Sequence, residues 1–534
     1  MARRGAKGWE VRGIMVDPAR LVERHEFYFD LLEHMAAWGL NTLWWHFDDD
    51  EGFMLELEGH PELASPHAFT RDEMKRLIEK AAGLGIDVVP EVESLGHARC
   101  ITSLPQYAEL ADGGEFGFNA ICPSHPRTLP LLAEIITEVA ALFPSRYFHA
   151  GMDEVDLGDC PRCAARAAGQ PAWWIYAEHA KAIHQIVAGA GKEMILWADH
   201  VEKAPEMLEE LPREIIMAHW HYTDIRPDAI RRSLKAGFRV IGCPALCHWG
   251  DVIMPNAGNF ANMAAMATEL DRLRPADRVL GVANTWWTCW RGLRDAYLPA
   301  VAYTGELLEA RRAVETDGFF RRYLTQTFGF SELGAAGAVA VLHAAMCTRD
   351  ELRAALFDSA DQMHRALSLS AEPHFARRAA AINSAVAILA GRAEGVQANR
   401  RQYQALILAG EVADVCFRRV SLLAQAFEEY SRAAHWHVDG APSERVGEPL
   451  GKAAKILRQM HAETGEVARA VAAEWDRTRY ADDPRKHFGP PLWRRWDALL
   501  VRLDRAVAFS EKLAADLGRG IDEYARTGRL PGGL

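Results

Sequence analysis

The sequence predicts an α/β fold in which a (β/α)8 barrel, residues 1–317, is followed by an all-α helical domain, residues 318–534. Short apolar runs alternate with amphipathic stretches through the first part, and uninterrupted apolar runs are typical of parallel strands buried on both faces. Eight such strand–helix units suit a barrel. An open, doubly wound sheet is the alternative, but no glycine-rich phosphate loop follows the first strand. Beyond residue 318 the strand pattern ends.

The predicted strands are short apolar segments that recur along the barrel part. They are 11–17, 41–47, 86–92, 147–153, 193–199, 214–220, 238–244 and 279–287. Apolar residues at i, i+3, i+4 and i+7 predict helices over 28–35 and 74–81. Thr70 and Glu73 form a capping-box signature for the second helix, and Gly83 or Gly85 ends it. Further helical patterns cover 126–142, 173–189, 226–236, 259–272 and 293–311, with a short one near 203–210.

The C-terminal part is dominated by Ala, Arg, Leu and Glu, as in AEPHFARRAAAINSAVAILAGRAEG (371–395). This composition predicts several long helices with apolar stripes at helical spacing. We expect these stripes to pack in a core, or between two copies of the chain in a homodimer, rather than to bind a ligand.

The composition of the chain bounds its partners and surroundings. The 534 residues carry a net charge of −12, which does not favour binding to nucleic acid or to an anionic membrane surface. No apolar stretch approaches the roughly 20 residues needed to span a bilayer. The N-terminal segment MARRGAKGWEVRG has no apolar stretch of the kind found in secretory signals, and the nine cysteines read as reduced thiols. We therefore expect a soluble, cytoplasmic protein.

Polar and aromatic residues gather just past the predicted strands, where the active sites of barrel enzymes lie. The residues at these strand ends are Asp17, Arg20, His46, Asp48, Asp49, Asp50, Glu91, Glu93, His97, Asp153, Glu154, Trp197, Asp199, His219, Trp220, Tyr222, His248, Trp249, Trp286, Trp287 and Trp290. Carboxylates and guanidinium groups bind hydroxyls, and indole rings stack on the apolar faces of sugars. This combination of acidic and aromatic residues at the strand ends predicts a site for a neutral carbohydrate.

The segment FHAGMDEV (148–155) resembles the His-x-Gly-x-Asp-Glu signature of family 20 glycoside hydrolases, the β-N-acetylhexosaminidases. VDPAR (16–20), TLWWHFDDDEGF (42–53), VVPEVESLGH (88–97), ILWAD (195–199) and MAHW (217–220) resemble other segments of that family, in the same order along the chain. NTWWTCWRGLRDAYLPA (284–300) is most similar to the last barrel segment of the subgroup related to hexosaminidase D.

The resemblance implies a role for each matched residue. Its catalytic residues are Asp153, Glu154, His97 and Asp49, and its substrate-binding residues are Arg20, Trp197, Trp220, Trp287, His149 and Asp199. It implies a retaining exo-β-N-acetylhexosaminidase for terminal β-linked GlcNAc or GalNAc, in which the sugar's own acetamide oxygen is the nucleophile. Asp153 would stabilise the oxazolinium intermediate, and Glu154 would protonate the leaving oxygen. The family chemistry requires no cofactor and no metal.

Two departures from the family pattern leave other functions open. The chain has GCPALCHWGD (242–251) where the family has Tyr-x-Asp, and Cys289 where the family has a glutamate. Alternatives are therefore a retaining glycosidase for a different amino sugar, or a non-catalytic carbohydrate-binding protein on a degenerate barrel. Separately, Cys160 and Cys163 form a C-x-x-C pair, but a structural zinc site normally needs four ligands. Cys243, Cys247 or His248 could complete such a site if their loops met.

Overall fold

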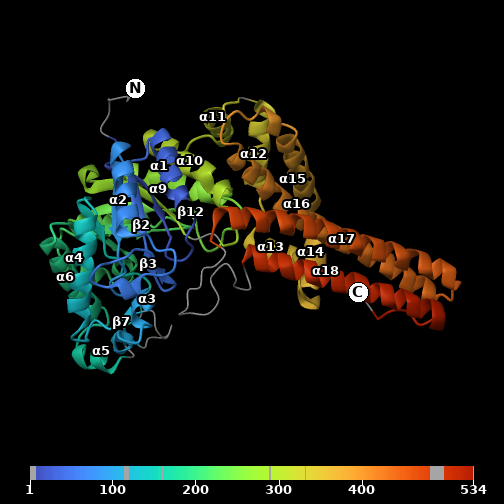
Figure 1. The fold of residues 1–534 in the computed structure, drawn as a ribbon, viewed down its shortest axis with the longest axis horizontal. Helices are drawn as coiled ribbons and strands as arrows, with labels where there is room; N and C mark the ends of the chain where they lie inside the picture. Colours follow the sequence, from blue (N-terminus) through green and yellow to red (C-terminus); the bar gives the residue numbers. More distant parts are fainter. Residues whose placement is uncertain are drawn as a thin grey trace.

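The computed structural model describes residues 8–112, 120–155, 157, 160–287, 290–330, 332–480 and 498–532. Its first part is a closed barrel of eight parallel strands, as the sequence predicts (Figure 1). The strands are β1 (Val11–Val16), β2 (Thr42–His46), β5 (Asp87–Glu91), β8 (Tyr147–His149), β9 (Glu193–Trp197), β10 (Ile216–Trp220), β11 (Arg239–Cys243) and β13 (Val279–Trp286). They pair in this order, and β1 also pairs with β13, which closes the sheet.

The strands are buried on both faces, which explains their uninterrupted apolar sequences. Trp44 and Trp45 are neighbours in β2 and therefore point to opposite faces. Both are 0% exposed. Trp44 packs inside the barrel with Trp197, whereas Trp45 packs in the larger core between the sheet and the helices. Both faces of β2 are thus core.

Helices follow the strands close to their predicted positions. They are α1 (Glu26–Ala37), α2 (Arg71–Gly83), α4 (Thr128–Leu142), α6 (Trp174–Gly189), α8 (Pro227–Lys235), α9 (Ala257–Arg272) and α10 (Leu298–Ala310). The capping box of α2 is formed in both directions between Thr70 and Glu73. Gly85, at φ +73°, supplies the left-handed residue after α2. Near 203–210 the structure has α7 (Asp199–Lys203) and a 3-10 turn (Pro205–Glu209) instead of one helix.

Several very short elements in the loops were not predicted. They are β3 (Asp48–Asp49), β4 (Gly52–Phe53), α3 (Arg99–Thr102), β6 (Ala111–Asp112), β7 (Ala120–Ile121), α5 (Pro161–Arg166) and β12 (Ala245–Cys247). Elements of two to six residues are too short to carry a readable periodicity. The fourth barrel strand also ends earlier than expected, at His149 instead of residue 153.

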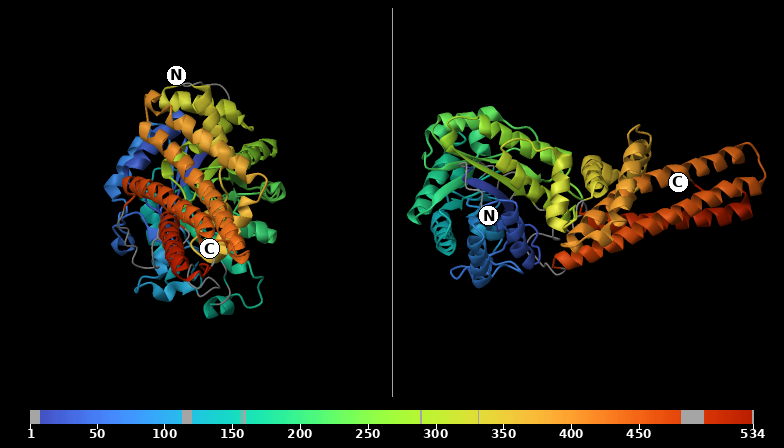
Figure 2. Two further views of the ribbon diagram at one scale, coloured as in Figure 1. Left: turned by 90° about the vertical axis from the view of Figure 1, so that its right-hand side faces the viewer. Right: turned by 90° about the horizontal axis from the view of Figure 1, so that it is seen from above.

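The C-terminal part is helical, as predicted. It contains α11 (Thr316–Phe328), α12 (Leu333–Ala345), α13 (Arg349–Ala355), α14 (Ala360–Ser370), α15 (Phe375–Ala390), α16 (Arg400–Val438), α17 (Ser443–Thr478) and α18 (Leu499–Thr527). The last three lie side by side and extend away from the barrel as a long arm (Figures 1 and 2). The predicted boundary after residue 317 falls just inside α11 and stays a prediction.

None of the described helices has, by itself, both the length and the hydropathy needed to cross a bilayer. Only α11 and α12 together reach them, and these two helices are bent by 115° relative to each other.

Buried ion pairs join the C-terminal end of α17 to the barrel. Arg479 Nη2 lies 2.9 Å from Glu23 Oε1, on the segment that follows β1. Asp295, in the 3-10 turn after β13, lies 2.6 Å from Arg294 Nε and 3.4 Å from Arg477 Nη2. The helical part therefore contacts segments that leave the same end of the barrel as the predicted site. We call this contact region the joint.

Candidate active site

The loop after β8 carries the adjacent carboxylates Asp153 and Glu154. In this loop Gly151, Met152 and Glu154 have φ values of +61°, +75° and +47°. Left-handed residues break the alternation of a strand, in which neighbouring side chains face opposite sides. Non-glycine residues adopt such angles at a cost, and strained backbone of this kind is concentrated at functional sites. The turn lets two neighbouring acids reach the same place.

Gly151 and Gly96 allow the loops after β8 and β5 to approach closely. A Cβ on Gly151 would lie 2.1 Å from Oε2 of Glu93, and the same oxygen accepts the backbone N–H of Met152 at 3.1 Å. A Cβ on Gly96 would lie 2.3 Å from the carbonyl oxygen of Asp153. Only glycine fits at either position. Glu93, one of the polar residues at the predicted strand ends, therefore supports this turn, a role that the family resemblance does not imply.

His97 lies at the centre of the predicted catalytic residues. Its Nε2 is 3.9 Å from Oδ2 of Asp153 and 3.6 Å from Oε2 of Glu154, and its Nδ1 is 3.4 Å from Oδ1 of Asp49. One carboxylate oxygen of Asp153 and one of Glu154 lie within 4.8 Å of each other. The structure therefore brings all four residues together around one ring.

The two carboxylates differ in exposure and in pKa. Asp153 is buried, and burial, followed by the nearby Asp199 and Glu154 charges, raises its pKa to about 7 against the effect of His97. The side chain of Glu154 is 58% exposed, and its interaction with His97 lowers its pKa. These shifts run opposite to the roles that the family resemblance implies, in which Asp153 is ionised and Glu154 is protonated. Burial also disfavours charge on His97, but Asp49 and Asp153 outweigh it and raise the pKa of the imidazole.

Arg20 is buried among carboxylates and indole rings. Its Nη2 lies 2.5 Å from Oδ2 of Asp49, and its Nη1 lies 3.1 Å from Oδ2 of Asp17. Its guanidinium carbon is 5.1 Å from the ring centre of Trp287 and 5.3 Å from that of Trp249, within the range of cation–π contact. Arg20 and His97 lower the pKa of Asp49 far below its usual range against the effect of burial. Asp49 is therefore an ionised link between Arg20 and His97.

The three predicted tryptophans occupy different depths. Trp287 lies beside Arg20, and its Nε1 donates to the hydroxyl of Tyr222 at 2.6 Å. Trp220 is half-buried and stacks on Tyr222 with a ring separation of 5.1 Å. Trp197 is 0% exposed and donates from Nε1 to Glu91. Its ring centre lies 4.4 Å from that of His149 and 5.8 Å from that of Trp44, so Trp197 packs in the barrel interior, and its contact with a sugar stays a prediction. Tyr222 is one of the strand-end residues. Its hydrogen bond to Trp287 joins the segments that follow β10 and β13, and the sequence alone does not predict such a contact.

His149 and Asp199 hold the backbone of the loop after β8. Nδ1 of His149 accepts the N–H of Gly151 at 3.0 Å, so the proton of this imidazole is on Nε2. Burial lowers the pKa of His149 to about 4, which keeps the ring neutral. Asp199 Oδ2 accepts the N–H of Glu154 at 3.3 Å. In the absence of substrate, both residues position the turn, and their predicted contact with sugar stays a prediction.

Comparisons with known proteins agree with these features. A family profile described as "Glycosyl hydrolase family 20, catalytic domain" matches residues 9–288. A beta-hexosaminidase of Vibrio furnissii is 27% identical over 285 residues, which cover 46% of this chain and 45% of that protein. A beta-N-acetylhexosaminidase of Cellulomonas fimi is 29% identical over 212 residues, 35% of this chain and 39% of that protein. The chain thus matches less than half the length of these curated relatives.

One solved structure supports the fold. The crystal structure of a beta-N-acetylhexosaminidase from Bacteroides fragilis NCTC 9343 is similar with a TM-score of 0.50 and 19% identity. The match covers 60% of this chain and 69% of that one. At this level of identity the similarity concerns the barrel fold alone.

Proposed function

The chain belongs to glycosyl hydrolase family 20, and from this premise we propose that it removes terminal β-linked N-acetylhexosamine, GlcNAc or GalNAc, from glycans. The proposed reaction retains the anomeric configuration and uses the substrate's acetamide as nucleophile. The predicted placement in the subgroup related to hexosaminidase D, the cytoplasmic location and the homodimer stay proposals of the same kind.

The observation that carries the proposal is the environment of Asp153. Its Oδ1 is buried and has no hydrogen-bond partner among the described residues, while Oδ2 faces His97. A buried carboxylate oxygen without a donor is costly, and a substrate N–H would satisfy it. An acetamide N–H bound there would turn the amide carbonyl oxygen toward C1 of the same sugar. Asp153 Oδ1 is thus available to accept the acetamide N–H, as the proposed mechanism requires.

The proposed reaction has two steps, formation and hydrolysis of the oxazolinium intermediate. The acetamide oxygen forms a bond to C1 as the bond from C1 to the leaving oxygen breaks, and Glu154 gives its proton to that oxygen. Asp153 holds the N–H and stabilises the positive oxazolinium ring. Water then attacks C1, Glu154 takes a proton from it, and the bond from C1 to the acetamide oxygen breaks. Glu154 ends protonated, as it began.

Glu154 must carry a proton in the complex, although its contact with His97 lowers its pKa. A sugar lying over its exposed side chain would remove water from the carboxylate and raise its pKa. The acetamide donor at Asp153 acts in the other direction, since a hydrogen bond to the charged form lowers a carboxyl pKa. Binding of the substrate would therefore favour the protonated form of Glu154 and the ionised form of Asp153.

Arg20 and Trp287 are the proposed contacts for the rest of the sugar. Arg20 already lies on the Trp287 ring and is held by Asp49. Its remaining donors suit ring hydroxyls, and the indole face suits the apolar face of the ring. Cys289, at the position of the family's final glutamate, lies outside the described residues.

The experiment is a turnover assay with nitrophenyl β-GlcNAc and nitrophenyl β-GalNAc. We expect activity on at least one of them, and we expect Glu154→Gln to lower kcat by about 10³-fold, since general acid–base catalysis contributes about that factor. Exposed Glu79→Gln on α2 is the matched control and should retain full activity. The variant Glu154→Gln should still bind a thiazoline mimic of the intermediate. Absence of turnover on both substrates, with no binding of the thiazoline to the wild-type protein, overturns the proposal.

A further inference from the structure

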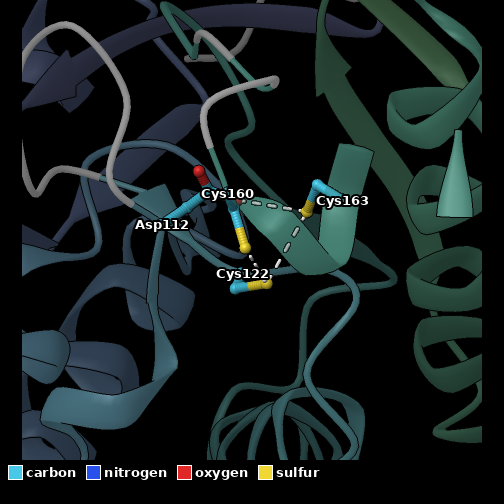
Figure 3. A group of neighbouring side chains, drawn as sticks. All are labelled: Asp112, Cys122, Cys160 and Cys163. Atoms are coloured by element: carbon cyan, nitrogen blue, oxygen red, sulfur yellow. Dashed lines mark hydrogen bonds between the residues drawn. The ribbon is translucent and has the colours of Figure 1, made fainter. Parts of the chain in front are cut away.

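A second cluster of reactive side chains lies outside the candidate active site. Asp112, Cys122, Cys160 and Cys163 are all buried, and one ligand atom from each lies within 4.8 Å of all the others (Figure 3). Sγ of Cys122 is 3.5 Å from Sγ of Cys160 and 3.6 Å from Sγ of Cys163. Sγ of Cys163 is 3.2 Å from Oδ2 of Asp112. Four potential ligands therefore surround one point.

The four residues lie in or beside three short elements, β6, β7 and α5, which the sequence pattern does not predict. Asp112 ends β6, and Cys122 directly follows β7, its antiparallel partner. Cys160 is the residue before α5, and Cys163 lies in the first turn of that helix. A hairpin that supplies two ligands opposite a C-x-x-C pair at a helix start is a familiar arrangement for a structural metal.

The distances fit a tetrahedral ion better than the alternatives. A zinc–sulfur bond of about 2.3 Å places two sulfurs of a tetrahedron about 3.7 Å apart. A disulfide would place them about 2.0 Å apart. Cys122, Cys160 and Cys163 are free thiols. Three thiolates and one carboxylate form a donor set that favours zinc over calcium or magnesium, which prefer oxygen ligands alone.

We propose that Asp112, Cys122, Cys160 and Cys163 bind one structural Zn²⁺. The ion would form three Zn–S bonds and one Zn–O bond, and the three thiol protons would pass to solvent. This proposal departs from the sequence-based expectation of no metal. It also corrects the expected completion of the C-x-x-C pair, because Cys122 and Asp112 join it and the candidates Cys243, Cys247 and His248 do not.

The site would couple two loops that carry catalytic residues. The N–H of Ile121, next to Cys122, donates to the carbonyl oxygen of Leu95 at 2.9 Å, two residues before His97. Cys160 follows the loop of Asp153 and Glu154 along the chain. Since four protein ligands leave no open position on zinc, the ion would act as a clamp and would not contact substrate.

Metal content and thiol state test the proposal without depending on the proposed function. The full chain is expressed with added zinc, purified without chelators, and analysed by plasma mass spectrometry. We expect about one zinc per wild-type chain, and a loss of at least 10-fold in bound zinc for Cys122→Ser and Cys163→Ser. Cys347→Ser, at a buried cysteine of the helical part, is the matched control and should keep its zinc.

A second measurement keeps the test decisive if these variants fold poorly. The wild-type protein is stripped of metal, reconstituted with Co²⁺, and examined for thiolate-to-cobalt charge transfer and the visible bands of tetrahedral cobalt. Both bands support the proposal. A wild-type protein with less than a tenth of an equivalent of zinc and no cobalt bands overturns it. So does a disulfide within the cluster, detected by peptide mapping under non-reducing conditions as a cross-link between peptides that carry Cys122, Cys160 or Cys163.

Discussion

Asp153 at the barrel mouth and Asp295 at the joint are both buried aspartates, yet their pKa values shift in opposite directions. Around Asp153, burial and the charges of Asp199 and Glu154 outweigh the opposing effect of His97 and raise its pKa to about 7. Around Asp295 the nearest charges are Arg294 and Arg477, and they lower its pKa against the effect of burial. At the joint, two arginines neutralise Asp295. In the candidate active site, other acids lie close to Asp153, and its Oδ1 has no hydrogen-bond donor among the described residues.

The difference separates stability from function. A buried charge with matched partners contributes to stability once it is in place, and its removal leaves those partners unpaired. A buried charge among like charges costs stability and is retained where chemistry uses it. Replacing each aspartate by the neutral, nearly isosteric asparagine should therefore produce opposite results.

Asp153→Asn is expected to give the largest effect. It removes the carboxylate that would stabilise the oxazolinium ring, so kcat should fall by about 10³-fold. It also removes a crowded charge, so the free energy of unfolding should rise by about 1 kcal/mol. Steady-state kinetics and urea unfolding measure the two quantities on one preparation. A variant that is both inactive and less stable would contradict the comparison.

The stability difference should also depend on pH. The folded pKa of Asp153 is raised to about 7, so its charge costs no stability below about pH 4, where the carboxyl is protonated in both states. The cost grows between pH 4 and 7 and is constant above that. The increase in the free energy of unfolding caused by Asp153→Asn should therefore be larger at pH 8 than at pH 5.

Asp295→Asn should lower stability with little effect on catalysis. It leaves Arg294 and Arg477 without their shared carboxylate. Arg477 is 33% exposed and keeps Glu474, so the main cost is the broken buried pair with Arg294, about 3 kcal/mol. Because the folded pKa of Asp295 is lowered, its contribution is complete above about pH 4 and is lost only as the pH falls through that lower value. The deficit should thus be the same at pH 5.5 and pH 8. A kcat more than 3-fold below that of the wild type would show that the joint also shapes the site.

Arg20→Lys should give the smallest effect on activity. It extends the comparison to a paired aspartate within the candidate active site. Asp49 resembles Asp295 in having a guanidinium partner, at 2.5 Å. Lysine keeps the charge but loses the planar donors, so we expect KM to rise by about 10-fold with a smaller change in kcat. Binding of N-acetylglucosamine measured by calorimetry gives the matching change in Kd. An unchanged KM would remove Arg20 from the proposed sugar contacts.

The sequence predicted the barrel and the convergence of its polar strand ends because both follow from local patterns. Eight apolar runs specify parallel strands, and parallel strands bring Arg20, Asp49, His97 and Asp153 to one end. The exposure of Trp197 could not be predicted, because depth inside a barrel depends on how rings from different strands pack. The partners of Cys160 and Cys163 were also missed, since Cys122 lies 38 and 41 residues away along the chain.

The order of the carboxyl pKa values was the other feature beyond the reach of the sequence. Adjacent acids predict that two pKa values separate, but not which one rises. That depends on burial, and the left-handed Glu154 turns its side chain outward while Asp153 points inward. Backbone angles of single loop residues leave no signature in a residue pattern.

The long arm formed by α16, α17 and α18 provides a position for attaching another group to the protein. A helix of 39 residues is about 58 Å long, and the turn between α16 and α17 lies at the end of the arm remote from the barrel (Figure 1). Val438, beside this turn, is 82% exposed. Attachment of a dye, an affinity tag or a solid support near Gly440 would keep the bulky addition away from the candidate active site, so an immobilised preparation should be as active as the free protein.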